Sequence, residues 1–157
     1  GGFALDMSLP AMGMTIVKQR VNDKTAYIEQ QGNKKVIEGE DYKLMKSQLH
    51  PFAELYFIDN PAITFTGIEK INDVDAYVIK TPKARFFYDM KTGLKIAVEK
   101  EQKQGEQTMK TMLYYADYKD VKGVKYPFKM TLEAGMPIEL NVSEVKVNEG
   151  VTDTDFQ

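Results

Sequence analysis

The chain has 157 residues, of which 43% are hydrophobic, and a formal net charge of −2. This length suits one domain with a core of its own, and the charge excludes a global basic field for nucleic acid or anionic lipid. Cysteine is absent, which excludes disulfides, thiolate nucleophiles and cysteine-ligated metals, and no apolar run is long enough to span a membrane. Because the chain begins Gly1-Gly2-Phe3, we expect it to be a single domain, 1–157, excised from a longer polypeptide.

Alternation of apolar and polar residues dominates the sequence. In "VKYPFKMTL" (124–132), every second residue is apolar, as in a strand with one dry and one wet face. Such strands form antiparallel sheets, and turn signals recur at the spacing of an all-β fold. In chain order the predicted strands are 3–8, 12–20, 25–31, 34–38, 63–71, 74–80, 85–90, 94–103, 107–118, 124–133 and 138–147.

The same alternation assigns residues to faces. The dry face of strand 94–103 is expected to hold Leu94, Ile96 and Val98, and its wet face Lys95, Ala97 and Glu99. Strand 138–147 changes phase after Val142, which predicts a bulge there. Pro127 is expected at an edge or beside a bulge, because proline cannot donate to the ladder.

One stretch, 39–61, departs from this pattern. Its apolar residues follow helical spacing, with Asp41 as a candidate N-cap. Pro51 disfavours helical backbone at the preceding residue, so we predict two short helices, 42–49 and 51–58. Their apolar stripe is expected to pack as a lid on the dry face of the sheet.

The chain's single histidine, His50, lies in this stretch with Glu54 four residues later. The pair could act as a general base and its partner, but His50 more simply lies at a helix break on the surface. One histidine cannot complete the motif of a zinc peptidase or a structural zinc site. No phosphate-binding or nucleophile-elbow motif is present, so we predict no catalytic residue, metal site or cofactor.

Nine methionines are present, several of them in predicted strands. Methionine fills ordinary cores, and it is also common where a surface must fit variable apolar partners. The sequence therefore leaves two alternatives open, namely a filled core or an adaptable apolar cavity between sheet and helices.

Four runs of the sequence resemble the LolA/LolB-like lipoprotein-carrier superfamily. They are "GIEKINDVDAYVIK" (67–80), "RFFYDMKTGLKIAVEKE" (85–101), "YYADYKDVKGVKYPFKMTL" (114–132) and "IELNVSEVKVNEGVTDTDF" (138–156). The similarity is greatest to outer-membrane lipoprotein-sorting-like domains of Bacteroidetes-type bacteria, which also occur appended to insulinase-type zinc peptidases. It covers residues 60–157 well and the first 60 only by layout.

This resemblance implies a mainly β (α+β) fold, an open antiparallel β half-barrel of about ten strands covering one or two short helices. It also implies a non-catalytic periplasmic or outer-membrane-associated carrier whose partner is an acyl chain, lipid or lipoprotein. The expected cavity lining is Met14, Ile16, Leu49, Phe52, Tyr56, Phe86, Tyr88, Ile96, Met112, Tyr114, Tyr126, Phe128 and Met130. The alternative is an accessory or substrate-recognition domain of a zinc peptidase, with a filled core and no small ligand.

Overall fold

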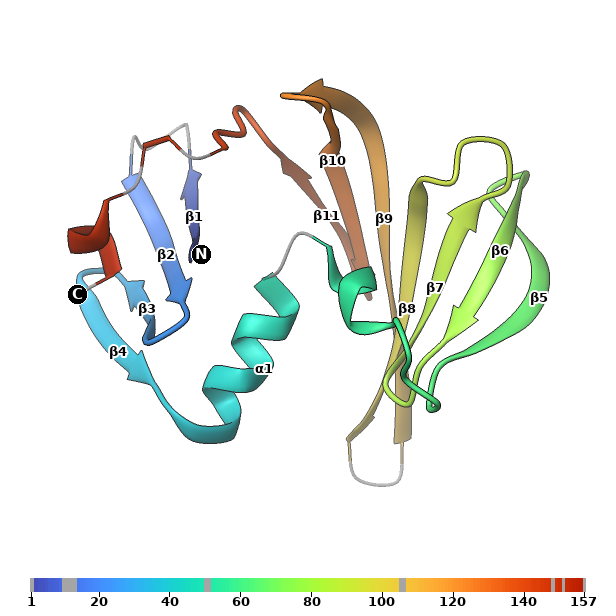
Figure 1. The fold of residues 1–157 in the computed structure, drawn as a ribbon, viewed down its shortest axis with the longest axis horizontal. Coiled ribbons are helices and arrows are strands. Elements are labelled where there is room, and N and C mark those ends of the chain that lie inside the picture. Colours follow the sequence, from blue (N-terminus) through green and yellow to red (C-terminus); the bar gives the residue numbers. More distant parts are fainter. Residues whose placement is uncertain are drawn as a thin grey trace. The chain divides into compact units, whose positions relative to one another are not determined.

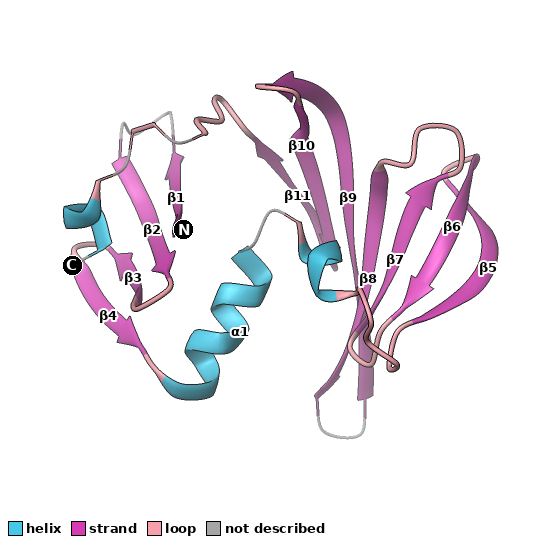
Figure 2. Cartoon of the chain, in the orientation of Figure 1, coloured by secondary structure: helices cyan, strands magenta, loops and turns pink. Residues whose placement is uncertain are grey.

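The computed structural model describes residues 2–9, 14–49, 52–104, 107–147, 149–150 and 152–156, and it is built mainly of strands (Figure 2). The strands are β1 (Gly2–Leu9), β2 (Met14–Asn22), β3 (Ala26–Gln30), β4 (Asn33–Ile37), β5 (Thr64–Ile71), β6 (Val74–Lys80), β7 (Ala84–Asp89), β8 (Lys95–Gln104), β9 (Gln107–Val121), β10 (Val124–Ala134) and β11 (Met136–Asn141). The helices are α1 (Gly39–Leu49) and the short 3₁₀ turns η2 (Ala53–Tyr56) and η3 (Asp153–Phe156).

The strands form two antiparallel sheets, one of four strands in the order β1-β2-β3-β4 and one of seven in the order β11-β10-β9-β8-β7-β6-β5 (Figure 1). All eleven predicted strands are present. The chain forms two compact units, the first comprising residues 1–58 with 148–157 and the second residues 59–147. The prediction of a single domain stays a prediction.

Three predicted boundaries are wrong. Helix α1 begins at Gly39, and the Tyr42 amide donates to the Glu38 carbonyl, so Asp41 lies within the first turn and is not the N-cap. The predicted helix 51–58 is only the 3₁₀ turn η2, whose four residues are too few for a stable α-helical nucleus. Strand β11 ends at Asn141, so the predicted bulge after Val142 does not form.

In the first unit, helix α1 contacts β2 and β3. The Tyr42 hydroxyl donates to the Asn22 carbonyl at 2.8 Å, and Lys46 Nζ lies 2.8 Å from Asp23 Oδ1. Both contacts join the helix to the turn between β2 and β3. The hydrogen bond and charge of Lys46 lower the pKa of the Asp23 carboxyl to about 2.

The C-terminal segment returns to this same unit. Turn η3 contacts β2, the Thr25 hydroxyl donates to the Phe156 carbonyl at 2.8 Å, and the Tyr27 hydroxyl donates to the Asp155 carbonyl at 2.8 Å. Phe156 is buried. The described part of the tail is therefore a component of the four-stranded unit.

In the second unit, the most buried residues form a small cluster on the seven-stranded sheet. Ala76, Val78, Phe87 and Ala97 are almost fully buried. The register places Val78 opposite Phe87 and Phe87 opposite Ala97, so these three lie in one row on one face. Pro127 lies in the part of β10 that precedes its pairing with β11, which spans Lys129 to Ala134. On that side β10 is an edge at Pro127, as predicted for a residue that has no backbone N–H to donate.

Replacing Phe156 with Ala should destabilise the protein by about 3 kcal/mol, because it removes a buried aromatic ring and leaves a cavity. Equilibrium unfolding in urea measures the change. Lys24→Ala, at an exposed turn position, is the control and should change stability by about 0.5 kcal/mol or less. An equal effect of both variants would contradict the anchoring role of Phe156.

Lys46→Met should raise the pKa of Asp23 from about 2 toward its ordinary value, because the hydrogen bond and positive charge that favour the carboxylate are lost. A carboxyl whose pKa is lowered by folding stabilises the protein above its unfolded pKa, and this contribution is lost as pH falls toward 2. The acid sensitivity of wild type between about pH 4 and pH 2 should therefore be smaller in the variant. Carbon-detected NMR titration of Asp23 measures the shift, and an unchanged titration would contradict the assignment.

Candidate functional site: the apolar face of the seven-stranded sheet

One face of the seven-stranded sheet carries two rows of apolar side chains that cross every strand. Residues directly opposite each other in antiparallel strands project to the same face, so the pairings between neighbouring strands trace each row. The first row is Phe65, Ile79, Phe86, Val98, Leu113, Leu132 and Ile138. The second row is Ile68, Tyr77, Tyr88, Lys95, Tyr115, Met130 and Leu140, in which Lys95 adjoins Tyr115 through a contact of its ammonium with the ring. We call the surface made by these rows the apolar face.

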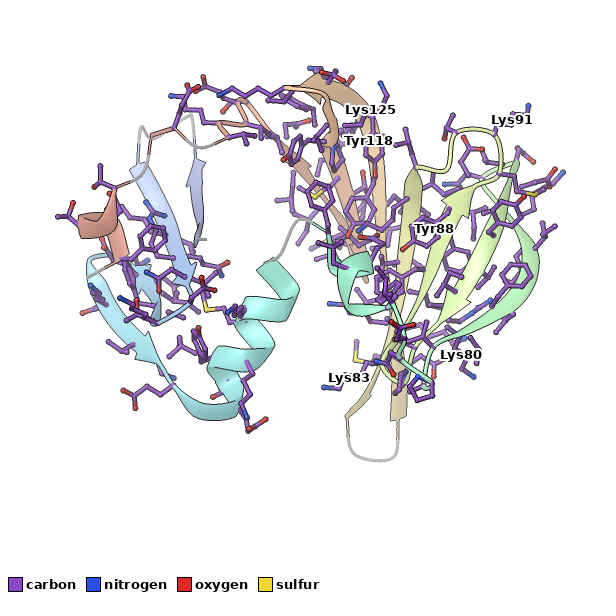
Figure 3. The ribbon with its side chains drawn as sticks, in the orientation of Figure 1. Lys80, Lys83, Tyr88, Lys91, Tyr118 and Lys125 are labelled. Carbon is purple, nitrogen blue, oxygen red and sulfur yellow. The ribbon has the colours of Figure 1, made fainter. Side chains whose placement is uncertain are left out.

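Much of the apolar face is exposed to solvent, although its side chains are mainly hydrophobic. Phe65, Ile68 and Ile138 keep 60%, 54% and 52% of their surface exposed. Val98 is buried, and most of the other residues in the rows are half-buried. Tyr88, labelled on β7 in Figure 3, lies near the middle of the second row. Contiguous apolar surface of this kind marks interaction or ligand-binding sites in soluble proteins.

The opposite face combines the buried cluster with charged side chains. The Arg85 guanidinium lies 5.1 Å from the centre of the Phe87 ring. It pairs with Glu99 at 3.2 Å and also with Glu69. By register, these side chains share one face with the buried residues Ala76 and Ala97. In β8, this is the face that the alternation pattern marked as wet.

The structure divides the predicted lining residues between the two faces. Phe86, Tyr88 and Met130 belong to the rows of the apolar face, and Tyr126 and Phe128 continue it along β10. The Lys119 ammonium lies 4.4 Å from the centre of the Phe128 ring, on the same face. These five residues therefore share one surface and are all half-buried.

Met112, Tyr114 and Ile96 lie elsewhere. Met112 is opposite Glu99 and Tyr114 is opposite Ala97, which places both on the charged face, where they and Ile96 pack against the buried cluster. Burial, with help from the Glu133 carboxylate, raises the pKa of the Tyr114 phenol. The three side chains contribute to the core, so the sheet does not bring them together with Phe86 and Tyr88.

For Ile96, the reason is a β-bulge that alternation did not reveal. Phe87 pairs with Ala97, but Tyr88 pairs with Lys95, so Ile96 is an extra residue in β8. The expected face assignment of Lys95 and Ile96 is thus wrong, since the bulge changes the phase of β8 between Lys95 and Ala97. Lys95, which the sequence placed on the wet face, lies on the apolar face.

The remaining predicted residues belong to the first unit. Met14 and Ile16 lie in β2, Leu49 ends α1, and Tyr56 lies in η2, but their side chains lie outside the described part of the structure. Phe52, directly before η2, is half-buried. His50 lies outside the described residues. The lid formed by 42–58 stays a prediction.

Within the described residues, no group of three or more His, Asp or Glu side chains is arranged to hold a metal ion. No described helix combines the length and hydropathy of a membrane span.

Comparisons with known proteins agree with this architecture. No family model and no curated protein matches the sequence. The fold is similar to the crystal structure of a LolA superfamily protein from Nitrosomonas europaea, with a TM-score of 0.57 and 13% sequence identity. The similarity covers 95% of this chain and 73% of that chain. The chain thus has a LolA-like fold, a mainly β, open antiparallel half-barrel, as the sequence predicted.

Proposed function

We propose that the apolar face of the seven-stranded sheet binds the acyl chain of a lipid or lipoprotein, and that this protein is a non-catalytic carrier or sorting domain. The observation that carries this proposal is the pair of apolar rows across all seven strands, with Phe65, Ile68 and Ile138 more than half exposed. A surface this apolar is costly to leave in water. The LolA-like fold supports the proposal, because the sequence resembles the LolA/LolB-like lipoprotein-carrier superfamily.

The energetics suit a long flexible chain. Burial of each methylene group of an acyl chain contributes about 0.8 kcal/mol, and the rows extend from one edge strand to the other. Aromatic residues such as Phe86, Tyr88 and Phe128 offer broad contact surfaces, and Met130 adapts its shape to its neighbours. A surface of this kind favours a long hydrocarbon over a compact ligand, since it is extended and has few fixed polar groups.

The carrier role implies a periplasmic or outer-membrane-associated location, which we include in the proposal. The relation to Bacteroidetes-type domains stays a prediction. So does the alternative, an accessory or recognition domain of an insulinase-type zinc peptidase with no small ligand.

Protein expressed in bacteria and extracted with organic solvent should take up added palmitate, seen as an adduct in native mass spectrometry. Ile68→Glu should weaken uptake about tenfold, which corresponds to the 1.4 kcal/mol expected for loss of part of one apolar contact. Ile68 is exposed, so the variant should fold like wild type.

Val74→Glu is the matched control, because Val74 is partly exposed on the opposite face of the same sheet, opposite Ile71. It should leave palmitate uptake unchanged. If wild type takes up no palmitate, the acyl-binding proposal fails, and the result favours the accessory-domain alternative. An equal loss of palmitate uptake in both variants would mean that the acyl chain binds elsewhere on the protein.

A further inference from the structure

The turn between β10 and β11 is apolar, unlike the other described turns of the seven-stranded sheet. It consists of Gly135, flanked by Ala134 at the end of β10 and Met136 at the start of β11, and Pro137 and Ile138 follow. Turn residues face water and are usually polar. Each of the other described turns in this sheet contains an exposed charged residue, namely Asp73, Lys83, Lys91 or Lys122.

The side chains at this turn are also highly exposed. Met136 keeps 81% of its surface exposed, the largest fraction among the described large hydrophobic residues, and Ile138 keeps 52%. Pro137, between them, is exposed as well. We call residues Gly135 to Ile138 the apolar tip. Adjoining exposed apolar residues mark contacts with membranes or with other proteins, so the apolar tip points to a contact outside the chain.

The apolar tip is continuous with the apolar face. Ile138 belongs to the first apolar row and Leu140 to the second, and Met136 projects to the same face because side chains alternate along β11. The residues of β10 opposite Ile138 and Leu140 are Leu132 and Met130. No charged residue therefore lies between the rows and the apolar tip on this face of the hairpin.

The charged residues of the hairpin lie on its other face. Glu133 is opposite Pro137, and Glu139 is opposite Thr131, so both carboxylates project away from the apolar face. Glu139 also pairs with Lys129 at 2.8 Å. The hairpin is thus amphipathic, which is the property of segments that bury one face among lipid head groups and keep the other in water.

The outer edge of β11 is poorly suited to pairing with a strand of another protein. The Val142 amide donates to the Phe128 carbonyl at 2.8 Å, so even-numbered residues of this segment direct their N–H groups to β10 and odd-numbered residues direct theirs outward. Pro137 is odd-numbered and has no N–H, so the outer edge lacks a donor at the apolar tip. Strand addition depends on such donors, whereas contact with a lipid bilayer does not.

We propose that the apolar tip inserts into the head-group region of a lipid bilayer, and that the apolar face exchanges its acyl chain with the membrane at this end of β10 and β11. Insertion removes the exposed surface of Met136 and Ile138 from water. The acyl chain then passes between the bilayer and the two rows along side chains that carry no charge. The exchange rests on the proposed acyl-binding function, whereas the membrane contact is tested apart from it.

The chain contains no tryptophan, so a single tryptophan introduced at the apolar tip reports on the surroundings of that position. On addition of excess phosphatidylcholine vesicles, the emission of Met136→Trp should shift to shorter wavelength, and lipids with brominated acyl chains should quench it. Met109→Trp is the matched control, because Met109 is an exposed methionine on the β8–β9 hairpin, beside Lys110. Its emission should stay unchanged.

Flotation with the same vesicles tests the contact without a reporter. Met136→Glu should lower the fraction of chain that floats about tenfold, because a carboxylate resists transfer from water. Met136→Leu should float like wild type. Met136→Glu should also take up palmitate in solution like wild type, since Met136 lies outside the two rows.

A Met136→Trp emission that vesicles leave unchanged would overturn the membrane contact, and palmitate uptake by wild type would then show that acyl binding stands. A dimer in sedimentation velocity that Met136→Glu dissociates, with no flotation of wild type, would also overturn it and identify a second copy as the partner. Vesicle binding without palmitate uptake would support the contact but overturn the exchange together with the acyl-binding function.

Discussion

The antiparallel register of the central strands β6, β7 and β8 is the constraint on which the rest of the second unit depends. Val78, Phe87 and Ala97 meet in one buried row, and the Arg85 side chain with its two glutamate partners lies over it. Because side chains alternate between faces, a slip of one residue would move the buried row to the other side of the sheet. Burial of this row therefore also decides which residues form the apolar face.

This arrangement separates stability from function in space. The buried cluster and the charged side chains that cover it occupy one face, so the other face does not have to be closed for the sheet to hold its register. Aromatic and aliphatic rows can then remain half-exposed on the apolar face, which is what the proposed acyl chain requires. In this view, the exposed Phe65, Ile68 and Ile138 are contact surface held in place by packing on the reverse side of the sheet.

The bulge at Ile96 links the two faces. Its apolar side chain packs against the buried cluster, while the residue before it, Lys95, is directed to the opposite surface beside Tyr88 and Tyr115. One inserted residue thus adds to the core and places a cation among aromatic rings.

Much of this fold could be predicted from the sequence by itself. The eleven strands follow from alternation and turn residues, which are local properties, and the order of its motifs was enough to predict the LolA-like half-barrel. The sequence also predicts the shared surface of Phe86, Tyr88, Tyr126, Phe128 and Met130. These residues lie in parts of β7 and β10 where side chains alternate regularly between the two faces.

Only the tertiary structure decided the remaining features, because each depends on a partner distant in the sequence. The phase of Lys95 and Ile96 depends on how β8 pairs with β7, and an apolar bulge residue leaves no mark in the alternation. Met112 and Tyr114 looked like lining residues, but their pairing with Glu99 and Ala97 places them over the core. Most of the last residues are polar, yet the hydroxyls of Thr25 and Tyr27 donate hydrogen bonds to the carbonyls of Phe156 and Asp155. Local sequence determines where strands form, and pairing between strands determines which way their side chains face.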